Sequence, residues 1–195
     1  NSSKLLIEKV QATQTLSGES EGRLPDGANN IVKFPITKTP GKSNYKPIES
    51  IVINEVLTHT DPPYEDAIEL LNLSENPLNI SKWWISNSGS NLQKYQIPDG
   101  TIINPRSTLV FYEGQFNSAP GTDRSFALNS SQGDQVILSA TDSNSKLTGY
   151  RIPIEFEAAE NGISFGRIKT SLGDQFVPLT RPTFGVDSPA SIQSF

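Results

Sequence analysis

Seven acidic residues and no Lys or Arg lie between residues 47 and 81, and three of these acids share one short loop. The three are Asp61, Glu65 and Asp66, and the same loop holds two consecutive prolines. Hard oxygen ligands gathered on a loop suit Ca²⁺, which extracellular modules can bind at roughly millimolar affinity. The spacing matches no EF-hand loop, so a solvated acidic face is the alternative interpretation. Asp61, Glu65 and Asp66 are therefore the candidate Ca²⁺ ligands.

Two further carboxylates, Glu55 and Glu69, lie inside predicted strands, where an unpaired buried charge is costly. We expect them to accept hydrogen bonds from backbone amides or to meet an arginine, for which Arg167 is the candidate. Carboxylates about 5 to 9 Å apart can also hydrolyse a glycosidic bond, and Glu65 or Asp66 with Glu69 is a formal pair. Nearly any acidic protein offers such pairs, so they do not argue for catalysis.

The composition itself argues against an enzyme. The chain has 195 residues with no Cys, no Met and a single His, His59. Zero Cys removes disulfides, Cys-zinc sites and thiol nucleophiles, and one His cannot supply a multi-His metal site. No Gly-x-Ser-x-Gly elbow presents a nucleophile to His59, which we expect on a loop. We therefore expect no catalytic residue and no cofactor other than the candidate Ca²⁺.

Two aromatic residues are the candidate binding residues. The run at 83–86 reads Trp-Trp-Ile-Ser, and alternation along a strand places Trp83 in the core and Trp84 on the opposite face. An exposed Trp84 beside Tyr95 could stack on a sugar ring or anchor a protein partner. The alternative is that Trp84 packs under the loop at 87–93 or against a neighbouring module.

Charge and hydropathy exclude two further kinds of partner. The net charge is −5 and the sequence pI is about 4.9, while the densest basic group, Lys33, Lys38, Lys42 and Lys46, is small. Nucleic-acid binding needs a larger basic surface. No apolar run approaches the roughly 20 residues of a membrane span. We expect neither nucleic-acid binding nor membrane insertion.

The elements that must position these residues are strands. Short apolar runs recur about every 8 to 15 residues between clusters of Asn, Ser, Gly, Pro and Asp, which is typical of an all-β sandwich or barrel. The best helix candidate, 64–73, reads equally well as a strand. The candidate strands are 51–57, 67–72, 82–87, 95–97, 108–113, 125–128, 135–139 and 149–154.

An internal repeat affects the domain count. Ser-x-Gly-Arg occurs at 20–23 and 164–167, an offset of 144 residues, and Thr-x-Gly follows at the same offset at 39–41 and 183–185. An apolar segment precedes each copy, at 5–10 and 152–156. We favour a true repeat over chance similarity of turn-rich sequence. The predicted domains are a C-terminal fragment of a preceding copy at 1–44, a linker at 45–49, a full copy at 50–188 and the start of the next linker at 189–195.

The order of the motifs resembles one known family. The motifs are Ile-Asn-Glu-Val at 53–56, Glu-Asp-Ala-Ile-Glu-Leu at 65–70, Ile-Ser-Lys-Trp-Trp-Ile-Ser at 80–86, Ile-Pro-Asp-Gly-Thr at 97–101, Leu-Val-Phe at 109–111, Gly-Asp-Gln-Val-Ile-Leu at 133–138 and Ser-Phe-Gly-Arg at 164–167. Their order and spacing resemble the lamin tail domain, an immunoglobulin-like module named from nuclear lamins. The resemblance covers 50–188, and residues 5–44 look like the end of a second copy. The chain departs from the family in having Lys82 where Gly is usual before the Trp.

The resemblance implies an immunoglobulin-like sandwich of nine strands, without catalytic residues, that serves attachment or protein association. The loop at 58–64 and the segment 154–179 are most similar to bacterial members, which sit in large secreted or surface proteins. We therefore expect a non-catalytic binding or tethering module of a multidomain exported bacterial protein, located outside the cell or on its surface.

The expected partner is a protein or a surface polysaccharide, and the expected state is a monomer or a weak oligomer formed through residues 1–44. The alternative function is a carbohydrate-binding accessory module that uses Trp84, with a structural Ca²⁺ at 61–69.

Overall fold

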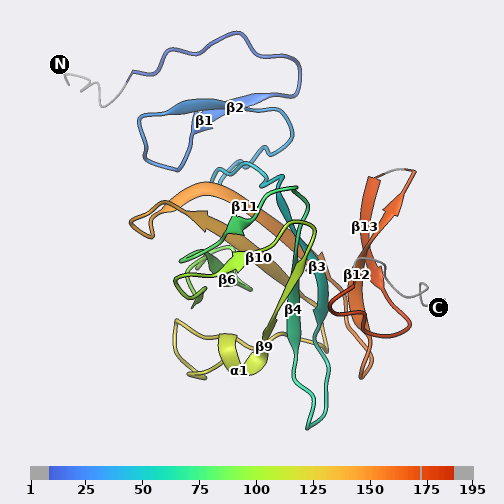
Figure 1. The fold of residues 1–195 in the computed structure, drawn as a ribbon. Coiled ribbons are helices and arrows are strands. Elements are labelled where there is room, and N and C mark those ends of the chain that lie inside the picture. The colour runs from blue at the N-terminus through green and yellow to red at the C-terminus, as the bar shows by residue number, and fades with distance from the viewer. Residues whose placement is uncertain (1–8, 172, 187–195) are drawn as a thin grey trace. The chain divides into compact units, whose positions relative to one another are not determined.

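Figure 1 shows the computed structural model, which describes residues 9–171 and 173–186. The chain divides into two compact units, Asn1–Lys46 (unit 1) and Pro47–Phe195 (unit 2), and each is described by itself. The predicted linker at 189–195 and most of the apolar segment at 5–10 lie outside the described residues. No helix in the described part of the chain is long and apolar enough to cross a membrane.

Unit 1 contains one antiparallel hairpin, β1 (Ser20–Arg23) with β2 (Ile31–Phe34). Gly22 permits close packing in this hairpin, because a Cβ there would lie 3.3 Å from the Phe34 ring. Phe34 is buried. The candidate strands do not include β1 or β2. Each is only four residues long, and the charged side chains of Glu21 and Lys33 occupy paired positions, so no apolar run marks the hairpin.

Unit 2 is a β-sandwich, as the resemblance implied. A five-stranded and a four-stranded antiparallel sheet together hold nine strands, and two further short strands form a separate two-stranded ladder. The five-stranded sheet has the order β13 (Gly173–Pro178), β12 (Ser164–Thr170), β3 (Ile51–Leu57), β4 (Ala67–Asn72) and β9 (Thr108–Tyr112). The four-stranded sheet has the order β11 (Leu147–Phe156), β10 (Asp134–Thr141), β6 (Trp84–Ser86) and β7 (Tyr95–Gln96). The small ladder pairs β5 (Leu78–Asn79) with β8 (Ile102–Ile103).

The core of unit 2 lies between the two large sheets. Alternate residues of the strands face inward, as a half-buried sheet requires. Burial of each such side chain stabilises the fold by about 1.5 to 3 kcal/mol. The buried side chains include Ile53, Val56, Ile68, Leu70, Phe111 and Phe165 from one sheet and Ile85, Val136, Leu138 and Phe156 from the other.

Most candidate strands agree with the structure, and β3 and β4 match 51–57 and 67–72 residue for residue. The strand predicted at 125–128 is wrong, because this segment is irregular. Its alternation has another cause: the Phe126 ring stacks on Phe116 at a centroid distance of 4.9 Å, and Phe126 N donates to Phe116 O at 3.2 Å. Phe116 ends α1 (Glu113–Phe116), a single helical turn that the sequence analysis did not predict.

Lys82 occupies the position where the resemblance leads us to expect glycine. Its φ angle is +65°, in the left-handed region that glycine adopts freely and that costs other residues about 1 to 2 kcal/mol. Lys82 N donates to Ile97 O at 3.0 Å, and Lys82 O accepts from Thr141 Oγ1 at 3.3 Å. Lys82 therefore adopts the left-handed backbone conformation before β6, although glycine would adopt it at lower cost.

Candidate functional site

The three candidate Ca²⁺ ligands lie on the loop that joins β3 to β4, at the bottom of Figure 1, but each has its own partner. Asp61 accepts a hydrogen bond from Asn161 Nδ2, and Glu65 Oε2 accepts from the amide of Gly114 at 2.9 Å. Among the described residues, no group of three or more His, Asp or Glu side chains could hold a metal ion. The structure thus does not bring Asp61, Glu65 and Asp66 together as a metal site.

Asp66 is the most perturbed of these acids. Its Oδ1 accepts from Thr60 Oγ1 at 3.0 Å, and the side chain is buried at the start of β4. The pKa of Asp66 is raised to about 6, mainly by burial and to a smaller extent by the nearby charge of Glu113, against the lowering effect of the Thr60 hydrogen bond. The loop therefore carries a carboxyl group that titrates close to neutral pH.

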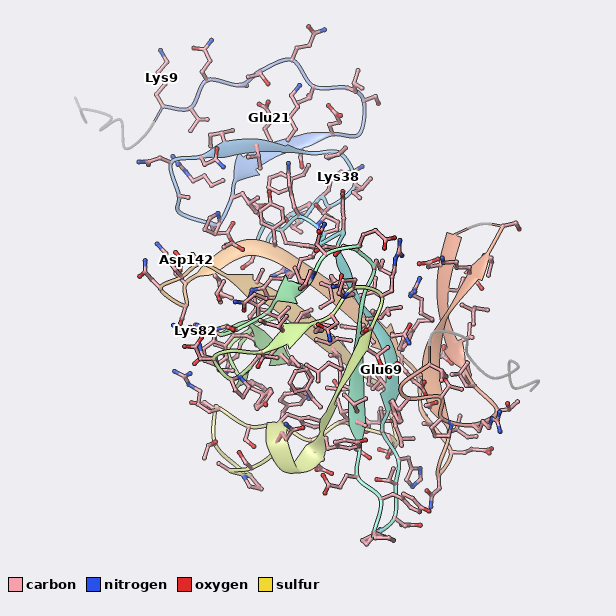
Figure 2. All side chains as sticks on the ribbon, viewed as in Figure 1. Lys9, Glu21, Lys38, Glu69, Lys82 and Asp142 are labelled. Carbon is pink, nitrogen blue, oxygen red and sulfur yellow. The ribbon has the colours of Figure 1, made fainter. Side chains whose placement is uncertain are left out.

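Glu55 and Glu69 face each other on the two central strands of the five-stranded sheet, where Figure 2 labels Glu69. A β-bulge at Asn54 shifts the register of β3, so that Glu55 lies directly opposite Glu69. The inward positions of β3 and β4 belong to Ile53, Val56, Ile68 and Leu70, so both carboxylates lie on the other face. Something other than the core must therefore satisfy them.

The segment after β13 supplies the partners of Glu55. Its Oε1 accepts from Ser164 Oγ at 2.6 Å and from the Thr183 amide at 2.8 Å, and its Oε2 accepts from Thr183 Oγ1 at 2.6 Å. Glu55 is almost fully buried. One buried carboxylate therefore fixes both the start of β12 and the segment that follows β13.

Glu69 holds the same segment two residues further on. Its Oε2 accepts from the Gly185 amide at 2.5 Å, and its Oε1 accepts from Asn54 Nδ2 at 2.8 Å. Burial raises the pKa of Glu69, with a smaller contribution from the charge of Glu55. Backbone amides are therefore among the partners, as predicted, but the proposed pairing with Arg167 is wrong. Arg167 Nη1 instead donates to Asp174 Oδ2 at 2.6 Å, from β12 to β13.

These bonds fix the segment at 181–186 as one wall of a cavity of about 730 Å³. The amides of Thr183 and Gly185 are held by the carboxylates, while Pro182 and Phe184, the residues on either side of Thr183, line the cavity. We call this cavity the aromatic groove. Its lining residues are Leu57, Pro63, Tyr64, Glu65, Tyr112, Gly114, Gln115, Pro182 and Phe184.

The other walls of the aromatic groove come from the β3–β4 loop and the first turn of α1. Gln115 Oε1 accepts from the Tyr112 amide at 2.9 Å, and Glu65 binds the Gly114 amide, so the loop and the helical turn are fixed to each other. Tyr64 is 76% exposed and Tyr112 is 47% exposed. The groove therefore presents aromatic rings to solvent on a framework held by hydrogen bonds.

Of the two interpretations of Trp84, the exposed platform is contradicted and the buried alternative agrees with the structure, since only 3% of the residue is accessible. β6 lies inside the four-stranded sheet, and both of its faces are covered. The Arg124 guanidinium carbon lies 4.9 Å from the centre of the Trp84 ring on the face opposite the core. Tyr95 is half-buried and meets Phe111 edge-on at 5.9 Å, and burial raises its pKa. Trp84 and Tyr95 therefore offer no open platform for a sugar.

His59 lies on the β3–β4 loop, as expected, with its Nδ1 2.9 Å from Ala159 O. No motif in the sequence marks the aromatic groove, because its lining comes from four separate segments. The two consecutive prolines at 62–63 were the signal closest to it. The Pro62–Pro63 peptide bond is cis, and Pro63 lines the groove beside Tyr64.

Comparison with models of known protein families shows to which family the chain belongs. The family model described as Lamin Tail Domain matches residues 45–152, which is more than half of the chain.

The chain belongs to the lamin tail domain family.

The lamin tail domain is an immunoglobulin-like and generally non-enzymatic module, in keeping with the sandwich of unit 2. The matched residues include both buried carboxylates, the β3–β4 loop and α1, and the match ends within β11. The wall formed by Pro182 and Phe184 therefore lies outside the part that matches the lamin tail domain. Searches of curated proteins and of solved structures found no match for the chain.

Proposed function

We propose that this lamin tail domain is a non-catalytic binding module that associates with a protein partner through the aromatic groove. The observation that carries the proposal is the exposure of Tyr64 and Tyr112 on a fixed framework beside Phe184 and two prolines. Exposed aromatic side chains are typical of protein-binding surfaces, where Tyr, Trp and Phe are enriched. A small, concave and mostly apolar site is also where binding proteins hold their ligands.

The wider setting that we propose is a larger exported protein of bacterial origin, in which this module tethers its host to a protein or a surface. The loop at 58–64 and the segment 154–179 support this setting through their resemblance to bacterial members of the family. Tyr64, the last residue of the first segment, lines the groove, and the second segment precedes the wall at 181–186 in the sequence.

The carbohydrate-binding alternative now depends on different aromatic residues. The buried position of Trp84 removes the platform on which it depended, and Tyr64 and Tyr112 are the exposed rings that could replace it. Sugar-binding sites combine stacking rings with several polar groups, and the groove supplies Glu65 and Gln115 for that role. We therefore keep sugar binding as an outcome that the experiment must distinguish.

The test compares the full chain with Tyr64→Ala and Phe184→Ala, using Tyr150→Ala as the matched control. Tyr150 is 44% exposed, close to the 47% of Tyr112, but lies on β11, outside the groove. Proteins retained by the immobilised chain are purified, and their binding is measured directly. We expect each groove variant to weaken binding at least about tenfold and the control to leave it unchanged.

Equal binding by the groove variants and the wild type would contradict the proposal. A glycan array run with the same variants separates the alternative. Binding of a glycan that is lost with Tyr64→Ala, together with no effect of that variant on protein binding, would favour the carbohydrate-binding module instead.

A further inference from the structure

One segment of unit 1 has the properties that the aromatic groove demands of a ligand. Residues 35–40 read Pro-Ile-Thr-Lys-Thr-Pro, and they follow β2 without belonging to a strand or helix. Ile36 is 76% exposed, which is unusual for an isoleucine. Residues 35–38 form no backbone–backbone hydrogen bond with any described residue. We call residues 35–40 the basic segment.

The groove calls for recognition of a partner through its side chains. Leu57 is the last residue of β3 and Tyr112 is the last residue of β9, so the groove lies at strand ends and offers no long edge for strand addition. Grooves lined by aromatic side chains bind proline-containing segments. The basic segment is bent at residues 35–36, where it is exposed, and Thr37 Oγ1 donates to Tyr45 O at 2.6 Å within unit 1. The basic segment has a proline at each end and an exposed aliphatic side chain between them.

The charges are complementary as well. Glu65 is the charged residue of the groove, and only its Oε2 has a hydrogen-bond partner among the described residues, which leaves Oε1 able to accept from a cation. Lys38 lies in the middle of the basic segment, is exposed, and forms no ion pair with a described residue. Figure 2 labels Lys38 on the coil that follows β2.

We infer that the aromatic groove of one molecule binds the basic segment of a second copy of this chain. Ile36 and the two prolines contact the rings of Tyr64, Tyr112 and Phe184, and Lys38 pairs with Glu65. The inference rests on the proposed function of the groove as a protein-binding site and names its partner.

The small size of this contact suggests weak affinity, and its two different surfaces determine the symmetry of the assembly. A segment of six residues in one groove buries far less surface than a standard interface of about 1,600 Å², so we expect a Kd on the order of 10⁻⁴ M. The two surfaces that meet are different, which makes the contact heterologous. Contacts of this kind generate open chains of molecules unless the rotation between neighbours closes a ring. The expected product is a concentration-dependent series of short chains.

Sedimentation velocity of the full chain between about 10 μM and about 1 mM tests the inference. We expect the mean sedimentation coefficient to rise with concentration and the rise to shrink when salt increases from about 0.1 M to about 0.5 M, because the ion pair is exposed. Ile36→Ser and Tyr64→Ala are each expected to weaken association at least about fivefold. Tyr150→Ala and Lys9→Glu serve as controls outside both surfaces and are expected to have no effect.

A charge exchange makes the test independent of folding defects. Lys38→Glu and Glu65→Lys are each expected to weaken association about fivefold or more, since each places like charges opposite one another. The double variant restores an opposite pair with the order reversed, and we expect it to recover most of the association. Thermal melting of each variant checks that it is folded.

Three results overturn the inference: a chain that stays monomeric at about 1 mM, association unaffected by Ile36→Ser, or a double variant no stronger than the single ones. Each of them leaves the proposed function intact if the groove variants still lose their protein partner in the capture experiment. If the chain does not self-associate and the groove variants also keep their protein partner in the capture experiment, the groove is not a protein-binding site.

Discussion

Two turns with the same sequence pattern, one in each unit, are held by different means. Thr39-Pro-Gly-Lys in unit 1 closes with Lys42 N donating to Thr39 O at 3.0 Å, and Thr183-Phe-Gly-Val in unit 2 closes with Val186 N donating to Thr183 O at 3.2 Å. The glycine of each turn has a positive φ, +72° at position 41 and +84° at position 185. Both therefore have the features of a type II turn, which needs a positive φ at its third residue.

The anchoring of the two turns differs. In unit 2 the carboxylates of Glu55 and Glu69 accept from Thr183 and Gly185. In unit 1 the amide side chain of Asn44 accepts from Thr39 Oγ1 at 2.8 Å and donates to Arg23 O at 3.0 Å. The turn itself is thus encoded locally, and tertiary contacts decide what it is attached to.

The hairpins before the two turns also correspond. Gly166 in β12 is covered by Leu179, with a Cβ at that glycine 2.5 Å from Leu179 Cδ1, and Gly22 in β1 is covered by Asn44 at 2.7 Å and by Phe34 at 3.3 Å. These features support our proposal that residues 1–44 are the end of a preceding copy of the module. Within the shared Ser-x-Gly-Arg motif, the second position differs: the buried Phe165 of β12 corresponds to Glu21 in β1. The hairpin of unit 1 is therefore adapted to a more polar surface.

The largest expected difference between the turns comes from removing their anchors. Glu55→Ala leaves Ser164 Oγ and both polar groups of Thr183 without an acceptor, so we expect the free energy of unfolding of unit 2 to fall by about 3 kcal/mol. Asn44→Ala is the matched change in unit 1, with an expected loss of about 1 kcal/mol. Urea denaturation followed by NMR of each unit measures both. Equal losses would show that the carboxylate anchor has no special weight.

The turns themselves should respond alike. Gly41→Ala and Gly185→Ala each force a residue with a Cβ into a positive φ, although there is open space around both positions. We expect each change to cost about 1 kcal/mol in its own unit. Thermal melting checks this expectation. A clearly larger cost at position 185 would mean that the carboxylates constrain the backbone more tightly than the turn does.

A smaller contrast is expected in the response to pH. The folded-state pKa values of Glu69 and Asp66 are raised, so their contribution to stability is greatest in acid and declines as pH increases, for Asp66 between about 4 and about 6. The free energy of unfolding of unit 2 is therefore expected to fall across this range. Glu69→Gln and Asp66→Asn should each reduce the slope. The Asn44 amide does not titrate, so the Asn44→Ala variant should keep the wild-type slope.

The smallest expected effect comes from the second residue of the turn. Unit 1 has Pro40 at this position and unit 2 has Phe184, and proline suits the second position of a type II turn. Phe184→Pro should thus change stability by no more than about 0.5 kcal/mol while it removes one ring from the groove. Calorimetric melting and the self-association assay separate the two effects. A large loss of stability would show that Phe184 is a core residue rather than a binding residue.

Local patterns were sufficient to predict much of the fold and little of the site. The strands at 51–57 and 67–72 could be predicted because their apolar runs are long and bounded by polar residues. The environment of Trp84 stayed open between two interpretations, because alternation reports the two faces of a strand but not whether the outer face is covered, here by Arg124. The partner of Glu69 was missed because Gly185 is 116 residues away and contributes only a backbone amide. A contact made by a backbone amide cannot be predicted from the pattern of side chains in the sequence.

The attachment of the segment 181–186 by buried carboxylates also sets an order of events during synthesis. Leu57, Tyr64 and Tyr112 are made early, whereas Phe184 leaves the ribosome about 120 residues after Tyr64. The groove acquires its last wall only when Thr183 and Gly185 reach Glu55 and Glu69. Nascent chains on one message therefore emerge with the basic segment complete and the groove unfinished, and each molecule becomes able to accept a neighbour only after its own sandwich has closed.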